Sequence, residues 1–182
     1  MKHKIAFGGG CHWCTEAVFQ SLKGVKKVEQ GYVASVDGND MFSEAVIVHF
    51  DDTVISQSIL IEIHLHTHKS TSNHSMRTKY RSAVYVFSEL QRQSAKSVVD
   101  LLQFQFQNKL VTQVLFFDRF KASRKQIQNY YYTNPQKPFC ERFINPKLQT
   151  LLKNFSKHTD TYKLKHLKNE SRKTHNSKHQ GS

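Results

Sequence analysis

Residues 8–14 read Gly-Gly-Gly-Cys-His-Trp-Cys and join a short apolar stretch to a helical pattern. Residues 4–7 predict a strand, and apolar residues spaced by three and four over residues 11–22 predict a helix. This order places Cys11 in the first helical turn, where backbone N–H groups are unpaired and the helix dipole is positive. Both effects favour a thiolate, so the chain must fold to present a reactive thiol at a strand-to-helix junction.

Cys14 follows Cys11 by three residues, which places both thiols on one face of the helix. Modest movement would bring such a pair within disulfide distance. We expect the glycines of residues 8–10 to let the backbone turn sharply and to leave room for a substrate. The motif is therefore typical of an attacking thiol with a resolving thiol beside it.

A zinc-binding module is the alternative interpretation of the same cysteines. Cys11 and Cys14 supply half of a zinc ligand set, and a second Cys-x-x-Cys unit is missing. A loose cluster of histidines further along the chain would have to complete the site: His64, His66, His68 and His74.

The remaining pattern mixes strands and helices without regular alternation. Residues 43–50 alternate strictly, which places Glu44 on the same face as Val46 and Val48. Further strands are predicted at 25–35, 80–88 and 110–120, and further helices at 54–68, 89–106, 123–134 and 145–155. Because two strands follow each other before the second helix, we expect an α+β fold, a two-layer α/β sandwich with a mixed sheet and a ferredoxin-like core.

Composition narrows the class of protein. The 182 residues carry a formal net charge of +13, but without an Arg-rich helix or a base-stacking motif, so we expect no specific nucleic-acid partner. Three cysteines do not make a secreted disulfide framework, and no apolar run fits a signal peptide or a membrane span. We therefore expect a cytoplasmic monomer with reduced thiols, a catalytic domain over residues 1–155 and a mobile, basic, polar tail over 156–182.

The stretch GGGCHWCTEAVF resembles the active-site signature of the A-type peptide methionine sulfoxide reductases, usually Gly-Cys-Phe-Trp followed by a short residue and Glu. Four later segments resemble further parts of that family in the same order: QGYVAS, SEAVIVHFDDTVIS, TKYRSAVY and NYYYTNPQKPFCERFINPKL. The resemblance implies an oxidoreductase for protein repair under oxidative stress, which reduces the S epimer of methionine sulfoxide, free or in proteins.

The resemblance also implies roles for residues. Cys11 is the nucleophile that attacks the sulfoxide sulfur, and Glu44 is the acid that protonates the oxygen. Trp13 is a wall of the methyl-binding pocket, His12 replaces the usual Phe beside it, and Tyr130 binds the oxygen through its hydroxyl. The acid role agrees with physical chemistry, because sulfoxide oxygen leaves poorly unless it is protonated and an apolar strand face favours a protonated carboxyl.

The resemblance implies that the catalytic cycle is completed by thiols. Cys14 condenses with the Cys11 sulfenic acid, and thioredoxin or another dithiol reduces the resulting disulfide, without metal or organic cofactor. Cys140 is expected to be a quiet core thiol rather than a second resolving residue. The chain departs from the family where a second pocket tyrosine is missing near Phe42, and where Lys125 replaces an acidic residue before Tyr130.

Overall fold

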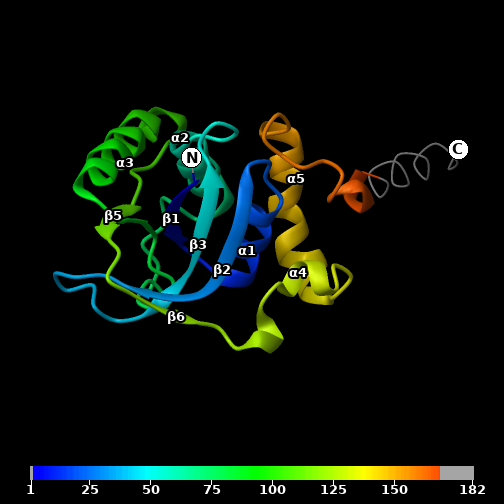
Figure 1. The fold of residues 1–182 in the computed structure, drawn as a ribbon, viewed down its shortest axis with the longest axis horizontal. Coiled ribbons are helices and arrows are strands. Elements are labelled where there is room, and N and C mark those ends of the chain that lie inside the picture. The colour runs from blue at the N-terminus through cyan, green and yellow to red at the C-terminus, as the bar shows by residue number, and fades with distance from the viewer. Residues whose placement is uncertain (1, 169–182) are drawn as a thin grey trace, which may run out of the picture.

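Four antiparallel strands and two helices form the centre of the computed structural model, which describes residues 2–168 (Figure 1). These elements are β1 (Lys2–Gly8), α1 (His12–Gln20), β2 (Val25–Ala34), β3 (Ser43–Asp51), α2 (Gln57–Thr67) and β4 (Ala83–Val86). The strands lie in the order β4-β1-β3-β2, and each neighbouring pair is antiparallel. This is the β-α-β-β-α-β arrangement of a ferredoxin-like fold, so the expected core and fold class are confirmed.

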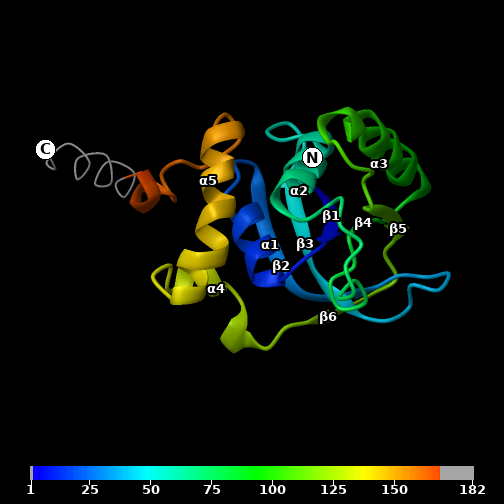
Figure 2. The ribbon, with the colours of Figure 1, turned by 180° about the vertical axis from the view of Figure 1, so that it is seen from behind.

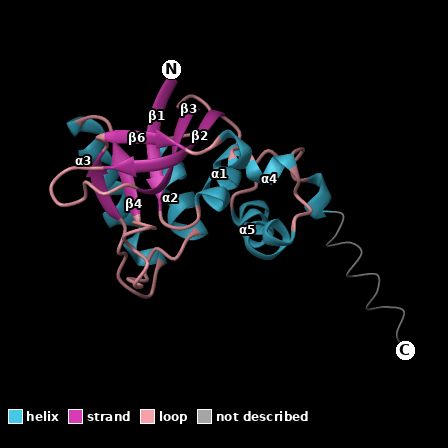
Figure 3. Ribbon diagram, turned by 90° about the horizontal axis from the view of Figure 1, so that it is seen from below, coloured by secondary structure: helices cyan, strands magenta, loops and turns pink. Residues whose placement is uncertain are grey.

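The single strand predicted over residues 110–120 is wrong, because the chain there forms two strands at opposite edges of the sheet. β5 (Gln113–Phe116) pairs parallel with β4, which makes the sheet mixed, and β6 (Arg119–Ala122) pairs antiparallel with β2. Only Phe117 and Asp118 separate the two strands, so the edges can be reached only if the sheet curls strongly, as Figure 3 shows. Apolar side chains such as Tyr85 and Ile47 fill the concave face.

The other face of the sheet carries the helices, as the reverse view in Figure 2 shows for α1 and α2. Alternate β3 residues Val46 and Val48 join the main core with the helices, whereas Ile47 joins the smaller cluster opposite. The predicted strand faces are therefore confirmed. Two further helices, α3 (Glu89–Leu102) and α5 (Asn145–Asn154), contribute buried side chains to the main core. No helix within residues 2–168 has the length and apolarity needed to cross a bilayer.

Two predicted helices are interrupted, and a third is preceded by an irregular turn. α3 ends at Leu102 and continues as a short 3₁₀ turn, Gln103–Gln105. The helix expected over 123–134 divides into a 3₁₀ turn, Lys125–Ile127, and the short α4 (Tyr130–Thr133). Asn129 causes the break, because it adopts a left-handed conformation with φ of 54°, which Asn tolerates better than most residues. A π-helical turn, Cys140–Ile144, leads into α5.

The tail does not begin at residue 156, because residues 156–168 pack on the domain. Thr159 forms a β-bridge with Leu22, and the Asp160 backbone N–H donates to the Ser21 carbonyl. Leu164 and Leu167, one helical turn apart, are fully buried in the main core. Because most residues of 156–168 are polar, composition alone did not reveal that these two leucines are buried. The rest of the expected tail, residues 169–182, lies outside the described residues.

Replacing Leu164 with Ala tests this docking. We expect the free energy of unfolding to fall by about 2–5 kcal/mol, because the substitution removes a fully buried side chain and leaves a cavity. Tyr162→Ala is the matched control, since that side chain is 74% exposed in the same segment and should change stability by less than about 0.5 kcal/mol. Urea unfolding followed by circular dichroism measures both, and equal effects would contradict the packing.

Candidate active site

Cys11 caps the N-terminus of α1 with its backbone. Its carbonyl accepts the backbone N–H groups of Cys14 at 3.1 Å and Thr15 at 3.3 Å, which starts the helix. The Cys11 sulfur is half-buried. Hydrogen bonding from the Cys14 thiol, and less strongly from the backbone N–H groups of Trp13 and Cys14, lowers the Cys11 pKa against the opposing effects of burial and of the Glu44 charge. Cys11 is therefore the sulfur prepared to be a thiolate.

Cys14 is buried one turn further along the same face. Its pKa is strongly raised, first because its thiol proton is held by Cys11, and then because burial disfavours the charged form. The two neighbouring cysteines thus divide into a thiolate and a protonated thiol. This is the division that an attacking and a resolving thiol require.

The glycines before Cys11 serve close packing rather than a sharp turn. None of residues 8–10 has a positive φ among the described residues. A Cβ on Gly8 would lie 2.9 Å from the Glu44 carbonyl, and one on Gly9 would lie 2.4 Å from the His68 ring. The expectation that residues 8–10 are glycines because the backbone must turn sharply is therefore wrong. Its first two glycines let β3 and the end of α2 approach the strand that delivers Cys11.

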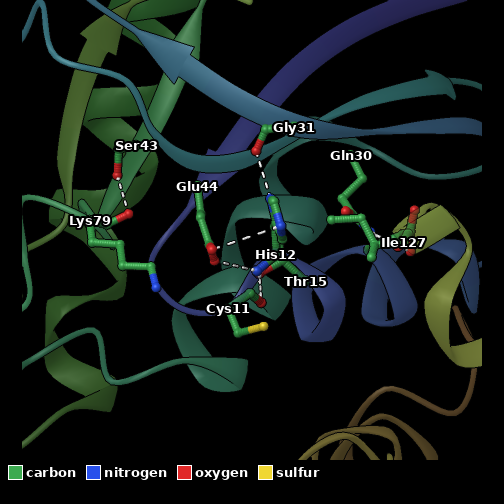
Figure 4. A network of polar contacts seen from close by, with 10 residues as sticks. Cys11, His12, Thr15, Gln30, Gly31, Ser43, Glu44, Lys79 and Ile127 are labelled. Carbon is green, nitrogen blue, oxygen red and sulfur yellow. Dashed lines mark hydrogen bonds and ion pairs between the residues drawn. The ribbon is translucent and has the colours of Figure 1, made fainter. Parts of the chain in front are cut away.

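Glu44 reaches from β3 to the start of α1. Its Oε2 accepts the backbone N–H of His12 at 3.1 Å, and the side chain is almost completely buried. The His12 ring lies behind it, 2% exposed, with Nδ1 2.7 Å from the Gly31 carbonyl and Nε2 3.8 Å from Glu44 Oε1. Figure 4 shows the carboxyl group directed at the helix start beside Cys11, with Lys79 on the other side of the loop. The structure thus brings the expected acid to the expected thiol.

An aromatic pair flanks the thiol on the other side. The rings of Trp13 and Tyr130 stack with centroids 4.0 Å apart and an interplanar angle of 9°, and Phe139 packs edge-on against Trp13 at 5.2 Å. The Lys137 amine lies 4.2 Å from the Tyr130 ring centroid. Burial, and then the nearby Cys140 and Cys11 sulfurs, raise the Tyr130 pKa. Tyr130 therefore keeps its proton and can donate it in a hydrogen bond near Cys11.

Glu16 is a site residue to which the sequence reasoning gave no role. Its carboxyl is 2% exposed and accepts backbone N–H groups from Asn129 at 3.0 Å and Tyr130 at 3.1 Å, and the Gln30 amide at 3.0 Å. Burial raises the Glu16 pKa, and these three bonds oppose the rise. Glu16 therefore holds the start of α4 against α1 and so places Tyr130 over Trp13. The sequence did hold one sign of this role: Glu16 is acidic, and no Lys or Arg lies three or four residues away on the helix to pair with it.

The histidines proposed as zinc ligands do not converge on the cysteines. His64 Nε2 lies 2.8 Å from the Gly8 carbonyl, and His68 bonds to the His64 carbonyl and to Ser82. His66 pairs with Gln105 at the surface. No group of three or more possible ligands is found in the part of the chain that the structure describes, so the zinc-module alternative is wrong in its ligand set.

Cys140 is fully buried in the π-helical turn, where its thiol lies 3.6 Å from the Asn134 carbonyl. Burial raises its pKa, with a smaller opposing effect from Lys137. A thiol in this environment is held in its unreactive form.

Comparisons with known proteins agree with this geometry. The profile of the family described as "Peptide methionine sulfoxide reductase" matches residues 3–160. The peptide methionine sulfoxide reductase MsrA of Trichodesmium erythraeum (strain IMS101) is 37% identical over 171 residues, covering 85% of this chain and 97% of that protein. The protein of the same name from Pasteurella multocida (strain Pm70) is 36% identical over 161 residues, covering 81% of this chain and 92% of that protein.

The solved structures of Saccharomyces cerevisiae Mxr1 share the fold. The reduced form has a TM-score of 0.68 at 22% identity, covering 76% of this chain and 89% of that chain. Mxr1 in complex with Trx2 has a TM-score of 0.57 at 19% identity, covering 69% of this chain and 83% of that chain.

The role of Glu16 can be tested without a substrate, because Trp13 is the only tryptophan and reports on the Tyr130 stack. We expect Glu16→Ala to red-shift the emission, to increase acrylamide quenching about twofold and to cost about 1–3 kcal/mol, because it leaves buried N–H groups unpaired. Glu16→Gln, which keeps an acceptor oxygen, should lie in between. Asp100→Ala, an exposed change on α3, is the control. Unchanged emission in Glu16→Ala would show that α4 is held by other contacts.

The thiol arrangement predicts how the alkylation rate of Cys11 depends on pH. Cys14→Ala removes the donor that contributes most to lowering the Cys11 pKa, so the inflection of the rate should move to higher pH. Cys14→Ser keeps an O–H donor and should stay close to wild type. Iodoacetamide labelling followed by mass spectrometry of the Cys11 peptide measures each profile. Identical profiles for the two variants would exclude the hydrogen bond as the cause.

Proposed function

The chain belongs to the peptide methionine sulfoxide reductase family, and from that premise we propose that it reduces the S epimer of methionine sulfoxide, free or in oxidised proteins, with Cys11 as the nucleophile. The observation that carries the proposal is the convergence at the α1 N-terminus of an activated thiol, a protonated thiol and a carboxyl group. These three groups are a nucleophile, a resolving thiol and an acid, which are the parts that sulfoxide reduction through thiols requires.

In the first step Cys11 attacks the sulfoxide sulfur while Glu44 supplies a proton to the oxygen. The hydroxyl of Tyr130 donates a hydrogen bond to the same oxygen, which stabilises the charge that develops on it. Trp13 forms the wall on which the substrate methyl group rests, whereas the expected contact with His12 does not fit, because the His12 ring is buried behind Glu44. The oxygen passes to the Cys11 sulfur, methionine leaves, and Cys11 is left as a sulfenic acid.

In the second step the Cys14 sulfur attacks the oxidised Cys11 sulfur. An S–S bond forms as the S–O bond breaks, and the oxygen leaves as water. The closeness of the two thiols supports this role for Cys14, since no larger rearrangement is needed.

The Cys11–Cys14 disulfide must then be reduced by an external dithiol, for which thioredoxin is the proposed partner. The complex of the structural relative Mxr1 with Trx2 supports this choice. A cytoplasmic location would supply that reductant, and it remains part of the proposal, as does a monomeric state.

The cysteine roles separate in turnover assays on isolated S and R sulfoxides. Cys11→Ser should abolish methionine formation from the S epimer. Cys14→Ser should release about one methionine per enzyme and then stop when thioredoxin is the reductant, because the sulfenic acid is not resolved. Cys140→Ser is the control and should keep cycling. The proposal is wrong if Cys11→Ser stays active or if the R epimer is preferred.

A further inference from the structure

A cavity of about 320 Å³ lies at the end of the sheet where β3, β4 and β5 begin. Three segments contribute its lining: residues 38–41 after β2, residues 73–82 before β4, and residues 111–113 at the start of β5. Figure 2 shows the first two of these loops at the same end of the sheet. No residue of the candidate active site lines the cavity. Its volume is at the lower end of the range for small-molecule sites, about 300–1,000 Å³, so it suits a small ligand.

Arg81 lines this cavity with a guanidinium group that is only partly used. The side chain is 9% exposed. It donates to the Tyr85 hydroxyl at 3.2 Å through Nη1 and to the Met41 carbonyl at 2.8 Å through Nη2. Because a guanidinium carries five N–H donors, three of them have no partner among residues 2–168. Nε, which has no partner, is not sealed in the interior, so these donors open into the cavity.

The positive charge of the cavity has no counter-charge in its lining. Neither Arg81 nor Arg77, which lines the cavity beside it, forms an ion pair in the described part of the chain. Asp37 and Asp40 belong to the loop after β2, but both are exposed and neither lines the cavity. A buried charge is costly unless an opposite charge accompanies it. Two guanidinium groups around one cavity therefore attract an anion into it.

Arg77 differs from Arg81 because all of its donors are used. Its five N–H groups donate to four backbone carbonyls, those of Gly9, Lys69, Ser72 and Tyr80. These carbonyls satisfy the donors but leave the net charge of the guanidinium in place. Arg77 therefore holds the loop before β4 in shape and adds positive charge, whereas Arg81 supplies the free donors.

Uncharged donors surround the two arginines. Four lining side chains carry a hydroxyl or an amide without a side-chain partner among residues 2–168: Asn39, Asn73, Thr78 and Gln113. A phosphate group has several acceptor oxygens and fits the fork of a guanidinium, so it can use such a set of donors together. A carboxylate has two oxygens and would leave most of these donors unpaired. The lining therefore favours phosphate over carboxylate.

We propose that this cavity binds a phosphate group, either inorganic phosphate or the phosphate of a small monoester, and that Arg81 holds it through its free N–H groups. The site is separate from the sulfoxide chemistry. Arg81 contacts Tyr85 of the concave face, whereas the Glu44 carboxyl reaches α1 on the other face.

The two sites are joined through the backbone before β3 and β4. The Arg81 backbone N–H donates to the Ser43 hydroxyl at 2.7 Å, and that hydroxyl donates to the Lys79 carbonyl at 2.9 Å. The same carbonyl accepts the Glu44 backbone N–H at 3.0 Å. A bound phosphate therefore stabilises the segments that hold Glu44 without entering the active site.

Calorimetric titration of the full chain with inorganic phosphate, in a phosphate-free buffer of low ionic strength, tests the site. Wild type should bind one phosphate per chain. Gln113→Glu adds a carboxylate to the lining, where it repels the anion and takes the donors of Arg81, so binding should weaken at least about tenfold. Gln93→Glu makes the same charge change on the exposed side of α3 and should bind as wild type does.

Substitutions of Arg81 and a second phosphate compound complete the experiment. Arg81→Lys keeps the charge but loses the fork, so it should bind phosphate more weakly than wild type and more tightly than Arg81→Met. Thermal melts check that these variants are folded, and the comparison of Gln113→Glu with Gln93→Glu stands if they are not. Glycerol phosphate, titrated in parallel, identifies the source: tighter binding than inorganic phosphate assigns a monoester, and weaker binding assigns the free ion.

The proposal is overturned if wild type binds neither phosphate compound at millimolar concentration. It is also overturned if Gln113→Glu and Gln93→Glu bind phosphate equally well, which would indicate a general attraction of anions to a basic protein. Tighter binding of succinate than of phosphate would contradict the preference for phosphate. Binding is measured without a sulfoxide, so a failure of the proposed function leaves these outcomes unaffected.

Discussion

The hydrogen bond from the His12 backbone N–H to the Glu44 carboxyl fixes the geometry on which the site depends. The start of a helix offers unpaired N–H groups, and Cys11 has no side-chain oxygen to satisfy them. Glu44, reaching from the middle of the sheet, satisfies one of them, the N–H of His12. Thiol and acid therefore share one helix terminus.

This sharing also sets the electrostatics of the pair. A charge on Glu44 raises the Cys11 pKa, so an ionised carboxylate and a thiolate oppose each other at the same helix start. Hydrogen bonds to the Cys11 sulfur outweigh that opposition, and the Cys14 thiol contributes the largest of them. The pKa of the nucleophile is thus set mainly by its neighbours along α1, with an opposing effect from Glu44 on β3.

The sequence could predict those features that depend only on residues close together along the chain. The thiol pair, the helix start and the face of Glu44 follow from spacing within a few residues, and each was found. Glu16 has a role that depends on Asn129 and Tyr130, which are far away in sequence and are brought close only by the fold. The separation of β5 from β6 depends on the curl of the whole sheet, which no local pattern encodes. Two buried leucines outweighed the polar composition of residues 156–168.

A resolving thiol that is buried and strongly held as a thiol looks at first like a poor nucleophile. Its raised pKa has a consequence for the order of events, however, because a Cys14 that keeps its proton does not compete with Cys11 as a nucleophile. Keeping the proton on Cys14 makes it a donor that activates Cys11 while Cys11 is reduced. Oxidation of Cys11 removes the charge that held this proton, so the first step itself creates the conditions for the second. In the proposed cycle, the proton shared by the two sulfurs thus sets the order of attack and resolution.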